Sequence, residues 1–153
     1  MMPDTEIHSY DYDEDKIKLA KHCFAVAPNH IYELGDIINT EYVDSDIFII
    51  NDVLHYMTAD ERKTVLEKCL SKLKPGGKII VRDADKSELK THKLTKLTEW
   101  FSTSTVISFN KVARDIDFFD AEEMVSFAQK NGLEISITAN DEKTSNKIFF
   151  LKR

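Results

Sequence analysis

The segment Asp46-Ile-Phe-Ile-Ile-Asn-Asp52 decides the fold that we expect for this chain. Four consecutive apolar residues lie between polar residues, a pattern typical of a central strand that helices cover on both faces. We therefore expect Asp46–Asp52 to be a nearly fully buried strand at the centre of a sheet. One of its neighbours should be the next predicted strand, Lys78–Arg82.

A strand, a helix and a second strand are predicted before this segment. Ile7–Asp11 alternates imperfectly, as a short strand does, and Asp13 can cap the helix that follows it. Pro28 and Asn29 should end that helix, and His30–Leu34 is the second strand. Because strands and helices alternate through short connections, we expect parallel pairing of the strands.

The remainder of the chain predicts three helices and a closing hairpin. Thr58 with Glu61 forms a capping box, and Pro75-Gly76-Gly77 turns the chain from the first of these helices into the strand Lys78–Arg82. The second helix is expected from Ser87 to about Ser104. The third begins at Asp120, with Glu123 as a further capping signal, and stops at Asn131-Gly132. The expected antiparallel hairpin consists of Leu133–Thr138 and Lys147–Lys152.

Composition limits the kind of protein. A chain of 153 residues, 42% of them hydrophobic, can bury one core, so we expect a single domain over residues 1–153. The net charge of −6 disfavours nucleic acid as a partner, because phosphate binding needs clustered Lys and Arg. The absence of a membrane span or a signal-peptide pattern predicts a cytoplasmic protein. Cys23 and Cys69 have no chelating spacing, so we expect reduced core thiols and no metal site.

Two segments resemble class I (Rossmann-like) S-adenosylmethionine-dependent methyltransferases. One is Asp46-Ile-Phe-Ile-Ile-Asn-Asp-Val-Leu-His-Tyr56, and the other is Leu73-Lys-Pro-Gly-Gly-Lys-Ile-Ile-Val-Arg82. In that family the first is the fourth strand with its following loop, and the second turns the chain into the fifth strand. The terminal hairpin resembles the family's reversed seventh strand beside the sixth. The resemblance implies an α/β three-layer sandwich with a mixed sheet and a C-terminal antiparallel hairpin.

The resemblance also implies that the first strand is missing. The family normally begins with a strand and a Gly-x-Gly-x-Gly-like loop that holds the methionine portion of the cofactor. None of the four glycines in this chain can form that loop; they are Gly35, Gly76, Gly77 and Gly132. A truncated gene model, a deliberate fragment or a degenerate domain would each explain this. Without a first strand, Ile7–Asp11 should flank Asp46–Asp52, the chain should bind S-adenosylmethionine weakly or not at all, and exposed sheet edges should favour a homodimer.

The resemblance places the S-adenosylmethionine site at the carboxyl ends of the predicted strands. Asp11 would accept hydrogen bonds from the ribose hydroxyls, and Asp36 would accept from the adenine amino group while its apolar neighbour packs on the ring. The cofactor-binding candidates are Asp11, Tyr12, Asp36, Ile37, Asn51 and Asp52. The residues alone leave two structural interpretations open: a solvated acidic turn around Asp11, and an ordinary Gly-Asp turn at Asp36.

The catalytic candidates are His55 and Tyr56, which follow the central strand where it emerges into a loop. An imidazole can act as a general base near neutral pH, and Tyr56 could line the acceptor pocket. A structural role for His55 is the alternative, because methyl transfer needs mainly in-line positioning when the acceptor is already nucleophilic.

Further polar and aromatic residues stand near the predicted site. Arg82, Asp83 and Asp85 could face the substrate, although a salt bridge would explain Arg82 equally well. Trp100 and Phe101 could roof the acceptor pocket, but their helical spacing favours a core position.

The function that the resemblance implies is methyl transfer from S-adenosylmethionine to a small-molecule or lipid-like acceptor. An O, N or C nucleophile would attack the methyl group and release S-adenosylhomocysteine. Two alternatives remain. One is a non-catalytic methyltransferase-like interaction domain or fragment. The other is a different nucleotide-binding α/β enzyme such as a dehydrogenase, which would also need a glycine fingerprint.

Overall fold

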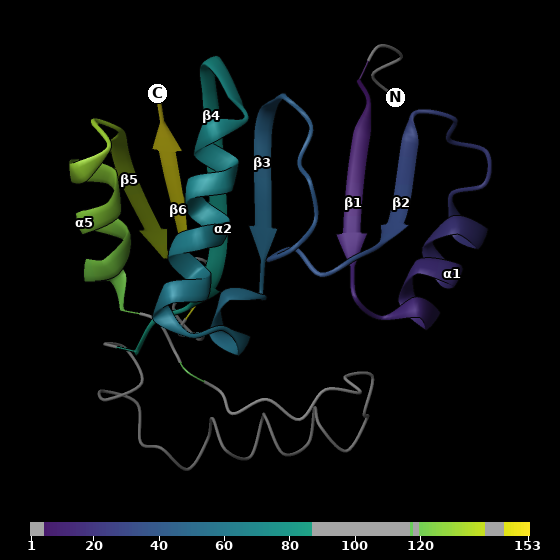
Figure 1. Ribbon diagram of the computed structural model, residues 1–153, viewed down its shortest axis with the longest axis horizontal. Helices are drawn as coiled ribbons and strands as arrows, with labels where there is room; N and C mark the ends of the chain where they lie inside the picture. Colours follow the sequence, from purple (N-terminus) through teal and green to yellow (C-terminus); the bar gives the residue numbers. More distant parts are fainter. Residues whose placement is uncertain (1–4, 87–116, 118–119, 140–145) are drawn as a thin grey trace. The chain divides into compact units, whose positions relative to one another are not determined.

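The computed structural model describes residues 5–86, 117, 120–139 and 146–153. They belong to two compact units, Met1–Glu41 and Tyr42–Arg153. Figure 1 labels the helices and strands of both units. The predicted helix from Ser87 to Ser104, with Trp100 and Phe101, lies outside the described residues.

The first unit is a strand, a helix and a second strand, as predicted. Strand β1 spans Ile7–Asp11, helix α1 spans Glu14–Cys23 and strand β2 spans His30–Leu34. The two strands pair in parallel, with Ile7 opposite His30 and Asp11 opposite Leu34. Their carboxyl ends therefore meet at one edge of this two-stranded sheet.

Helix α1 begins as its sequence predicts but ends earlier. The Asp13 carboxylate accepts hydrogen bonds from the backbone N–H groups of Asp15 (2.9 Å) and Lys16 (3.4 Å), which confirms the cap. The helix ends at Cys23, so the prediction that Pro28 and Asn29 end it was wrong. A turn in which Ala27 N–H donates to Phe24 O replaces the last expected helical turn.

The exposure of Cys23 corrects the prediction that both cysteines are core thiols. Ile17 is the buried residue of α1, and Cys23 follows it by six positions. At 3.6 residues per turn, six positions put Cys23 roughly 120° away from Ile17 around the helix. Cys69 is buried as predicted, and both cysteines are free thiols.

The second unit is built on a four-stranded mixed sheet. In chain order its elements are β3 (Ser45–Asn51), the short 3-10 helix η1 (Leu54–Tyr56), α2 (Ala59–Ser71), β4 (Leu73–Ala84), α5 (Ala121–Lys130), β5 (Glu134–Ala139) and β6 (Asn146–Lys152). The strand order is β3-β4-β6-β5. Strands β3 and β4 are parallel, whereas β6 is antiparallel to both β4 and β5. This arrangement confirms the mixed sheet and the C-terminal antiparallel hairpin.

Both predicted helix caps of this unit are present. Thr58 and Glu61 form the reciprocal capping box of α2. Asp120 caps α5 by accepting from Glu122 N–H (3.1 Å), and Gly132 adopts a positive φ of 65° just after the helix. The prediction that Glu123 adds to this cap was wrong, because its carboxylate is bonded to Arg62.

Strand β4 begins at Leu73, five residues before the predicted start. Its pairing with β3 changes register between Ser45 and Ile47, opposite the Pro75-Gly76-Gly77 segment. Gly76 has a φ of 77°, and a Cβ atom on Gly77 would lie 2.7 Å from the backbone oxygen of Asp46. The two glycines therefore allow an irregular start to the strand, close to its neighbour.

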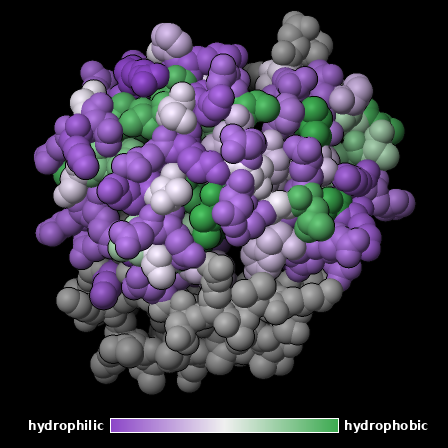
Figure 2. All heavy atoms as spheres, viewed as in Figure 1, coloured by the Kyte–Doolittle hydropathy of each residue, from purple (hydrophilic) through white to green (hydrophobic). Residues whose placement is uncertain are grey.

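The core of this unit lies on the face of the sheet that α2 and α5 cover (Figure 1). Register partners on neighbouring strands share a face, and Ile79 is opposite Leu151 just as Val81 is opposite Phe149. These four side chains are completely buried. The buried residues that the helices contribute include Val65, Leu66, Cys69, Met124, Phe127 and Ala128. Over the helices, the outer surface is mainly hydrophilic (Figure 2).

Strand β3 differs from the prediction in burial. It stands at one end of the strand order of its own sheet, with β4 as its neighbour, as predicted. The expected pairing of Ile7–Asp11 with Asp46–Asp52 would join the two units and stays a prediction. Side chains alternate across a sheet. Ile50 points to the helix-covered face and is buried, whereas Ile47 and Ile49 point to the opposite face and are 49% and 73% exposed. The prediction of a nearly fully buried strand was therefore wrong.

Candidate functional site

The carboxyl end of β1 presents Asp11. Its Oδ1 accepts a hydrogen bond from Asp13 N–H (2.9 Å), and its Oδ2 lies 4.0 Å from the Lys16 ammonium group. The side chain is 36% exposed, and the neighbouring Tyr12 is also exposed. Asp11 thus takes part in the acidic turn while keeping an accessible carboxylate at the sheet edge.

Asp36 follows β2 at the same edge, because Gly35 N–H donates to Asp11 O (3.0 Å). The Asp36 carboxylate accepts from Ile38 N–H (3.0 Å) and from the side-chain amide of Asn39 (2.9 Å). These bonds form the local turn that its sequence indicates. Asp36 is exposed, and Ile37 is half-buried.

Asn51 and Asp52 lie at the carboxyl end of β3, next to Arg82 of β4. Asp52 has a φ of 52°, a left-handed conformation that Asp tolerates better than most residues. Arg82 forms an ion pair with the Asp52 carboxylate, and Asp52 N–H donates to Arg82 O (2.9 Å). The salt bridge that was one interpretation of Arg82 is therefore present.

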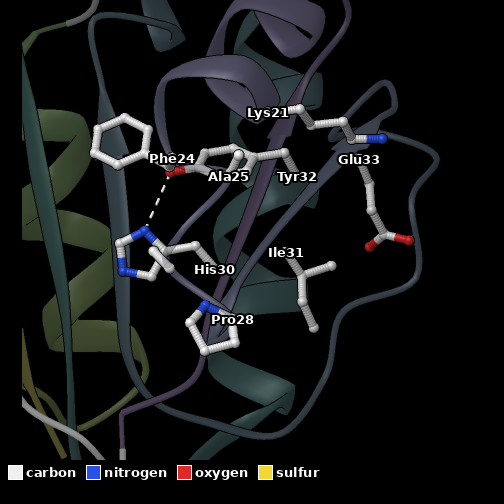
Figure 3. A pocket seen from close by; sticks show the side chains of 9 residues that line it. Lys21, Phe24, Ala25, Pro28, His30, Ile31, Tyr32 and Glu33 are labelled. Carbon is white, nitrogen blue, oxygen red and sulfur yellow. Dashed lines mark hydrogen bonds between the residues drawn. The ribbon is translucent and has the colours of Figure 1, made fainter.

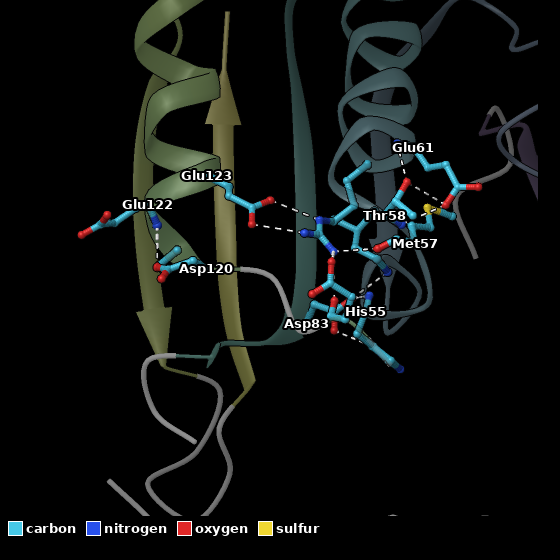
Figure 4. A network of polar contacts seen from close by, with 12 residues as sticks. His55, Met57, Thr58, Glu61, Asp83, Asp120, Glu122 and Glu123 are labelled. Carbon is cyan, nitrogen blue, oxygen red and sulfur yellow. Dashed lines mark hydrogen bonds and ion pairs between the residues drawn. The ribbon is translucent and has the colours of Figure 1, made fainter. Parts of the chain in front are cut away.

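His55 of η1 and Asp83, near the end of β4, form a buried pair (Figure 4). His55 Nδ1 lies 2.6 Å from Asp83 Oδ1. The other carboxylate oxygen accepts from the N–H groups of Leu54 (2.8 Å) and His55 (3.4 Å), while Ala84 N–H donates to Oδ1 (2.8 Å). Asp83 has no exposed surface and His55 is 5% exposed, so the pair is held away from bulk water.

Tyr56 covers one side of this pair. Its ring centroid lies 4.0 Å from that of the His55 imidazole, at an interplanar angle of 48°. The two predicted catalytic residues are therefore in contact.

Two charged residues near the site, Asp83 and Arg62, are buried, which the sequence analysis did not predict. Asp83 continues the buried alternation of Ile79 and Val81 along β4, a signal that could have placed its carboxylate in the core. Arg62 belongs to the buried set of α2 with Val65, Leu66 and Cys69, a helical spacing that could have indicated a buried cation.

Asp85 is fully buried but its contacts are structural. Its carboxylate forms an ion pair with Lys147 of β6 and accepts from Ala121 N–H (3.3 Å) at the start of α5. It therefore joins β6 and α5 to the end of β4. In the described part of the chain, no group of three His, Cys, Asp or Glu side chains could hold a metal ion.

An open pocket of about 510 Å³ lies between the end of α1 and β2 (Figure 3). Phe24 and Tyr32 stack there with ring centroids 5.9 Å apart, and His30 Nδ1 lies 3.2 Å from the Tyr32 hydroxyl. The lining includes Lys21 and Glu33 but none of the predicted site residues. The pocket is therefore distinct from the carboxyl edge of the sheet.

This fold is that of a class I methyltransferase, and the sequence agrees. The family model described as "Methyltransferase domain" matches residues 1–141. The chain belongs to this methyltransferase domain family, whose members use S-adenosylmethionine. Among curated proteins, no sequence matches the chain.

Solved structures share the fold at low sequence identity. Human N-acetylserotonin methyltransferase, in complex with S-adenosylmethionine, is 18% identical with a TM-score of 0.69; the match covers 99% of this chain and 41% of that one. An O-methyltransferase family 2 protein from Planctomyces limnophilus, in complex with apigenin, is 15% identical with a TM-score of 0.73, covering 99% and 44%. The N-methyltransferase NodS from Bradyrhizobium japonicum, in complex with S-adenosylhomocysteine, is 11% identical with a TM-score of 0.69, covering 97% and 66%.

The chain thus spans less than half the length of the first two of these proteins. None of the helices in the described residues has both the length and the apolarity that a membrane span requires.

Proposed function

We propose that this chain is the greater part of a methyltransferase domain that transfers the methyl group of S-adenosylmethionine to a small-molecule or lipid-like acceptor. Its two compact units together would form that single domain over residues 1–153. The observation that carries the proposal is the buried pair of His55, which follows β3, and Asp83, near the end of β4. The pair lies at the carboxyl edge, where open α/β sheets bind their ligands.

The His55–Asp83 geometry suits a general base. A carboxylate on Nδ1 selects the tautomer in which Nδ1 carries the proton and Nε2 carries the basic lone pair. The three backbone N–H groups that bind Asp83 keep its carboxylate in place. A hydroxyl acceptor would lose its proton to Nε2 while its oxygen attacks, so the pair favours a hydroxyl over an already nucleophilic amine.

The chemistry of the residues present supports two contacts with S-adenosylmethionine, at its ribose and at its adenine. Asp11 keeps an accessible carboxylate for the ribose hydroxyls, and a carboxylate has about four lone-pair sites, so its bond to Asp13 leaves capacity. Asp36 and Ile37 would hold the adenine, while Tyr12, Asn51 and Asp52 would border the cofactor. When bound, the cofactor supplies an electrophilic methyl group on sulfur.

The first experiment tests catalysis. The chain is incubated with millimolar methyl-labelled S-adenosylmethionine and two phenolic probes, N-acetylserotonin and apigenin. We expect transfer to at least one probe, and a loss of about a hundredfold or more in His55→Asn, the range that general-base catalysis contributes. The exposed His22→Asn is the matched control. Absence of transfer at saturating cofactor in the folded chain would instead support a non-catalytic interaction domain.

The second experiment tests cofactor binding. The chain contains no Gly-x-Gly-x-Gly loop, and losing roughly 4 kcal/mol of contacts would weaken binding about a thousandfold. We therefore expect S-adenosylhomocysteine to bind only at millimolar concentration in an NMR titration. Asp11→Ala should weaken binding a further fivefold or more, because charge-assisted bonds contribute roughly 1 to 3 kcal/mol. Asp44→Ala is the control, and an unchanged affinity in a folded Asp11→Ala variant would remove Asp11 from the site.

The proposal extends to assembly and location. Strand β3 stands at an end of its sheet and exposes Ile47 and Ile49, which favours pairing between two copies of the chain. Sedimentation velocity should show a dimer, and a monodisperse monomer would contradict this part.

Two free cysteines suit the reducing cytoplasm, the compartment that we propose.

A further inference from the structure

Arg62 is a buried cation near the proposed site, but it belongs to helix α2 and not to the sheet edge. Its side chain is 5% exposed. Nε and Nη2 donate to the two carboxylate oxygens of Glu123 on α5 (3.1 and 3.2 Å). This two-pronged contact uses the planar geometry of the guanidinium group, which a lysine could not reproduce.

The remaining guanidinium nitrogen serves a different part of the molecule. Nη1 donates to the backbone oxygen of Met57 (2.7 Å), to the backbone oxygen of Asp117 (2.9 Å) and to Asp117 Oδ2 (3.3 Å). Asp117 N–H in turn donates to the backbone oxygen of His55 (2.9 Å). The contacts close a ring from Arg62 through Asp117 and His55 to Met57 and back. Figure 4 labels Met57, His55 and Glu123.

This ring fixes the loop that carries the imidazole. The carbonyl groups on both sides of Tyr56, those of His55 and Met57, are each held by a hydrogen bond that leads to Arg62. Asp83 holds the imidazole ring itself at Nδ1 (2.6 Å). The histidine is therefore held through its backbone and through its ring, by elements far apart in the sequence.

The contact with Glu123 joins α2 to α5. The bonds to Met57 and Asp117 lead instead to the backbone around His55, and they supply partners to a buried positive charge that would be costly without them. We propose that Arg62 is a positioning residue for His55: through Met57 and Asp117 it keeps the loop in the conformation that places Nδ1 on Asp83. Its consequence for catalysis rests on the proposed function, but its effect on the imidazole does not.

The test uses the full chain with ¹⁵N-labelled histidine rings and needs neither cofactor nor acceptor. NMR follows the Nδ1–H signal of His55, assigned by its loss in His55→Asn. In Arg62→Met we expect the exchange of this proton with water to rise about tenfold or more, as the loop opens locally. A second tautomer should also become visible in the ring-nitrogen shifts. Lys63→Met, an exposed change on the same helix, should leave both signals unchanged.

A second pair of variants separates positioning from a general structural role. Glu123→Ala breaks the joint between α2 and α5 but leaves Met57 and Asp117 bonded to Arg62, so it should disturb the His55 ring less than Arg62→Met does. Arg62→Lys keeps the charge without the fork and should give an intermediate effect. It also serves if Arg62→Met fails to fold.

Wild-type ring signals in a folded Arg62→Met or Arg62→Lys variant would overturn the proposal, as would equal effects of Arg62→Met and Glu123→Ala. The experiment measures NMR signals of the His55 ring and does not depend on catalysis. If the wild-type chain transfers no methyl group, that result counts against the proposed function and not against this inference.

Discussion

At the scale of single residues, Asp83 is the side chain on which the site depends most. It is fully buried, and it accepts hydrogen bonds from three backbone N–H groups as well as binding His55 Nδ1. Asp83→Ala should lower the free energy of unfolding by about 3 kcal/mol, because it leaves buried donors unsatisfied. Urea denaturation followed by circular dichroism measures the change.

The control is Asp46→Ala, which removes an exposed carboxylate paired with Lys74 at 3.1 Å. Exposed pairs contribute roughly 0 to 1 kcal/mol, so this variant should remain close to wild type. Similar costs for the two variants would mean that the Asp83 network adds little to stability.

The two cysteines should differ in reactivity. Burial raises the pKa of the Cys69 thiol to about 12, whereas Cys23 is exposed. Because the thiolate is the nucleophile, a disulfide reagent at pH 8 should titrate one thiol in the native protein and two in denaturant. Two fast-reacting thiols in the native chain would contradict the burial of Cys69.

The same pKa gives a stability prediction with a defined sign. In the unfolded chain the Cys69 thiol has the ordinary pKa of 9.0, so it ionises at a lower pH than in the folded protein. Above pH 9 the unfolded state therefore binds fewer protons than the folded state. The contribution of neutral Cys69 is complete below pH 9 and is lost as the pH rises towards about 12. Cys69→Ala should flatten this part of the dependence of stability on pH.

Residue roles could be predicted where the partner is close in sequence. The caps at Asp13, Thr58 and Asp120 bond within three residues, so they were evident from spacing. His55 was a candidate by its place after a strand. Its partner Asp83 lies 28 residues away and Glu123 lies 61 residues from Arg62, and only the packed fold brings such pairs together.

At the scale of elements, helix α2 depends on its first turn. Thr58 accepts from Glu61 N–H (3.3 Å), and the Glu61 carboxylate accepts from Thr58 N–H (2.8 Å). Thr58→Ala should cost about 1 kcal/mol of stability, the usual value for a lost cap. Thr64→Ala is the matched control, because Thr64 lies inside the helix and bonds back to Asp60 O (2.9 Å). Its replacement by a better helix former should be neutral or stabilising.

Element bounds followed the sequence where a local signal exists. Strands β1 and β2 have the bounds predicted, and α2 and α5 begin at their capping residues. The end of α1 and the start of β4 were missed. Pro28 and Asn29 were taken to mark the end of α1, but a local turn from Phe24 to Ala27 follows the helix earlier. Pro75-Gly76-Gly77 was taken to precede β4, but the strand includes it, and Gly77 lies close to Asp46 O.

At the scale of the whole molecule, the sheet face opposite α2 and α5 should govern self-association. Ile49 is 73% exposed on that face. Ile49→Thr should reduce the dimer fraction in sedimentation velocity while changing the free energy of unfolding by less than about 0.5 kcal/mol, the usual limit for surface changes. The control is Ile79→Thr on the buried face, which should cost at least about 2 kcal/mol. An unchanged dimer fraction would exclude this face from the interface.

The fold class was predictable because two family-like segments and the order of elements agree. The burial of β3 was not predictable, because an apolar strand is buried only if other elements cover both of its faces. The apolar pattern of Asp46–Asp52 indicates that both faces can pack against such elements. In the structure, the described elements of its unit cover one face.

Strand β6 follows β5 in the sequence yet lies between β4 and β5 in space. Strand β5 has its ladder with β6, and β4 uses the edge away from β3 for the same partner. During synthesis, β4 can pair with β3 but has no partner at its other edge until residues 146–152 leave the ribosome. Strand β5 has no partner at all in this sheet until then. Nascent chains stalled before that point should be cleaved readily by protease, and those stalled well beyond it should resist.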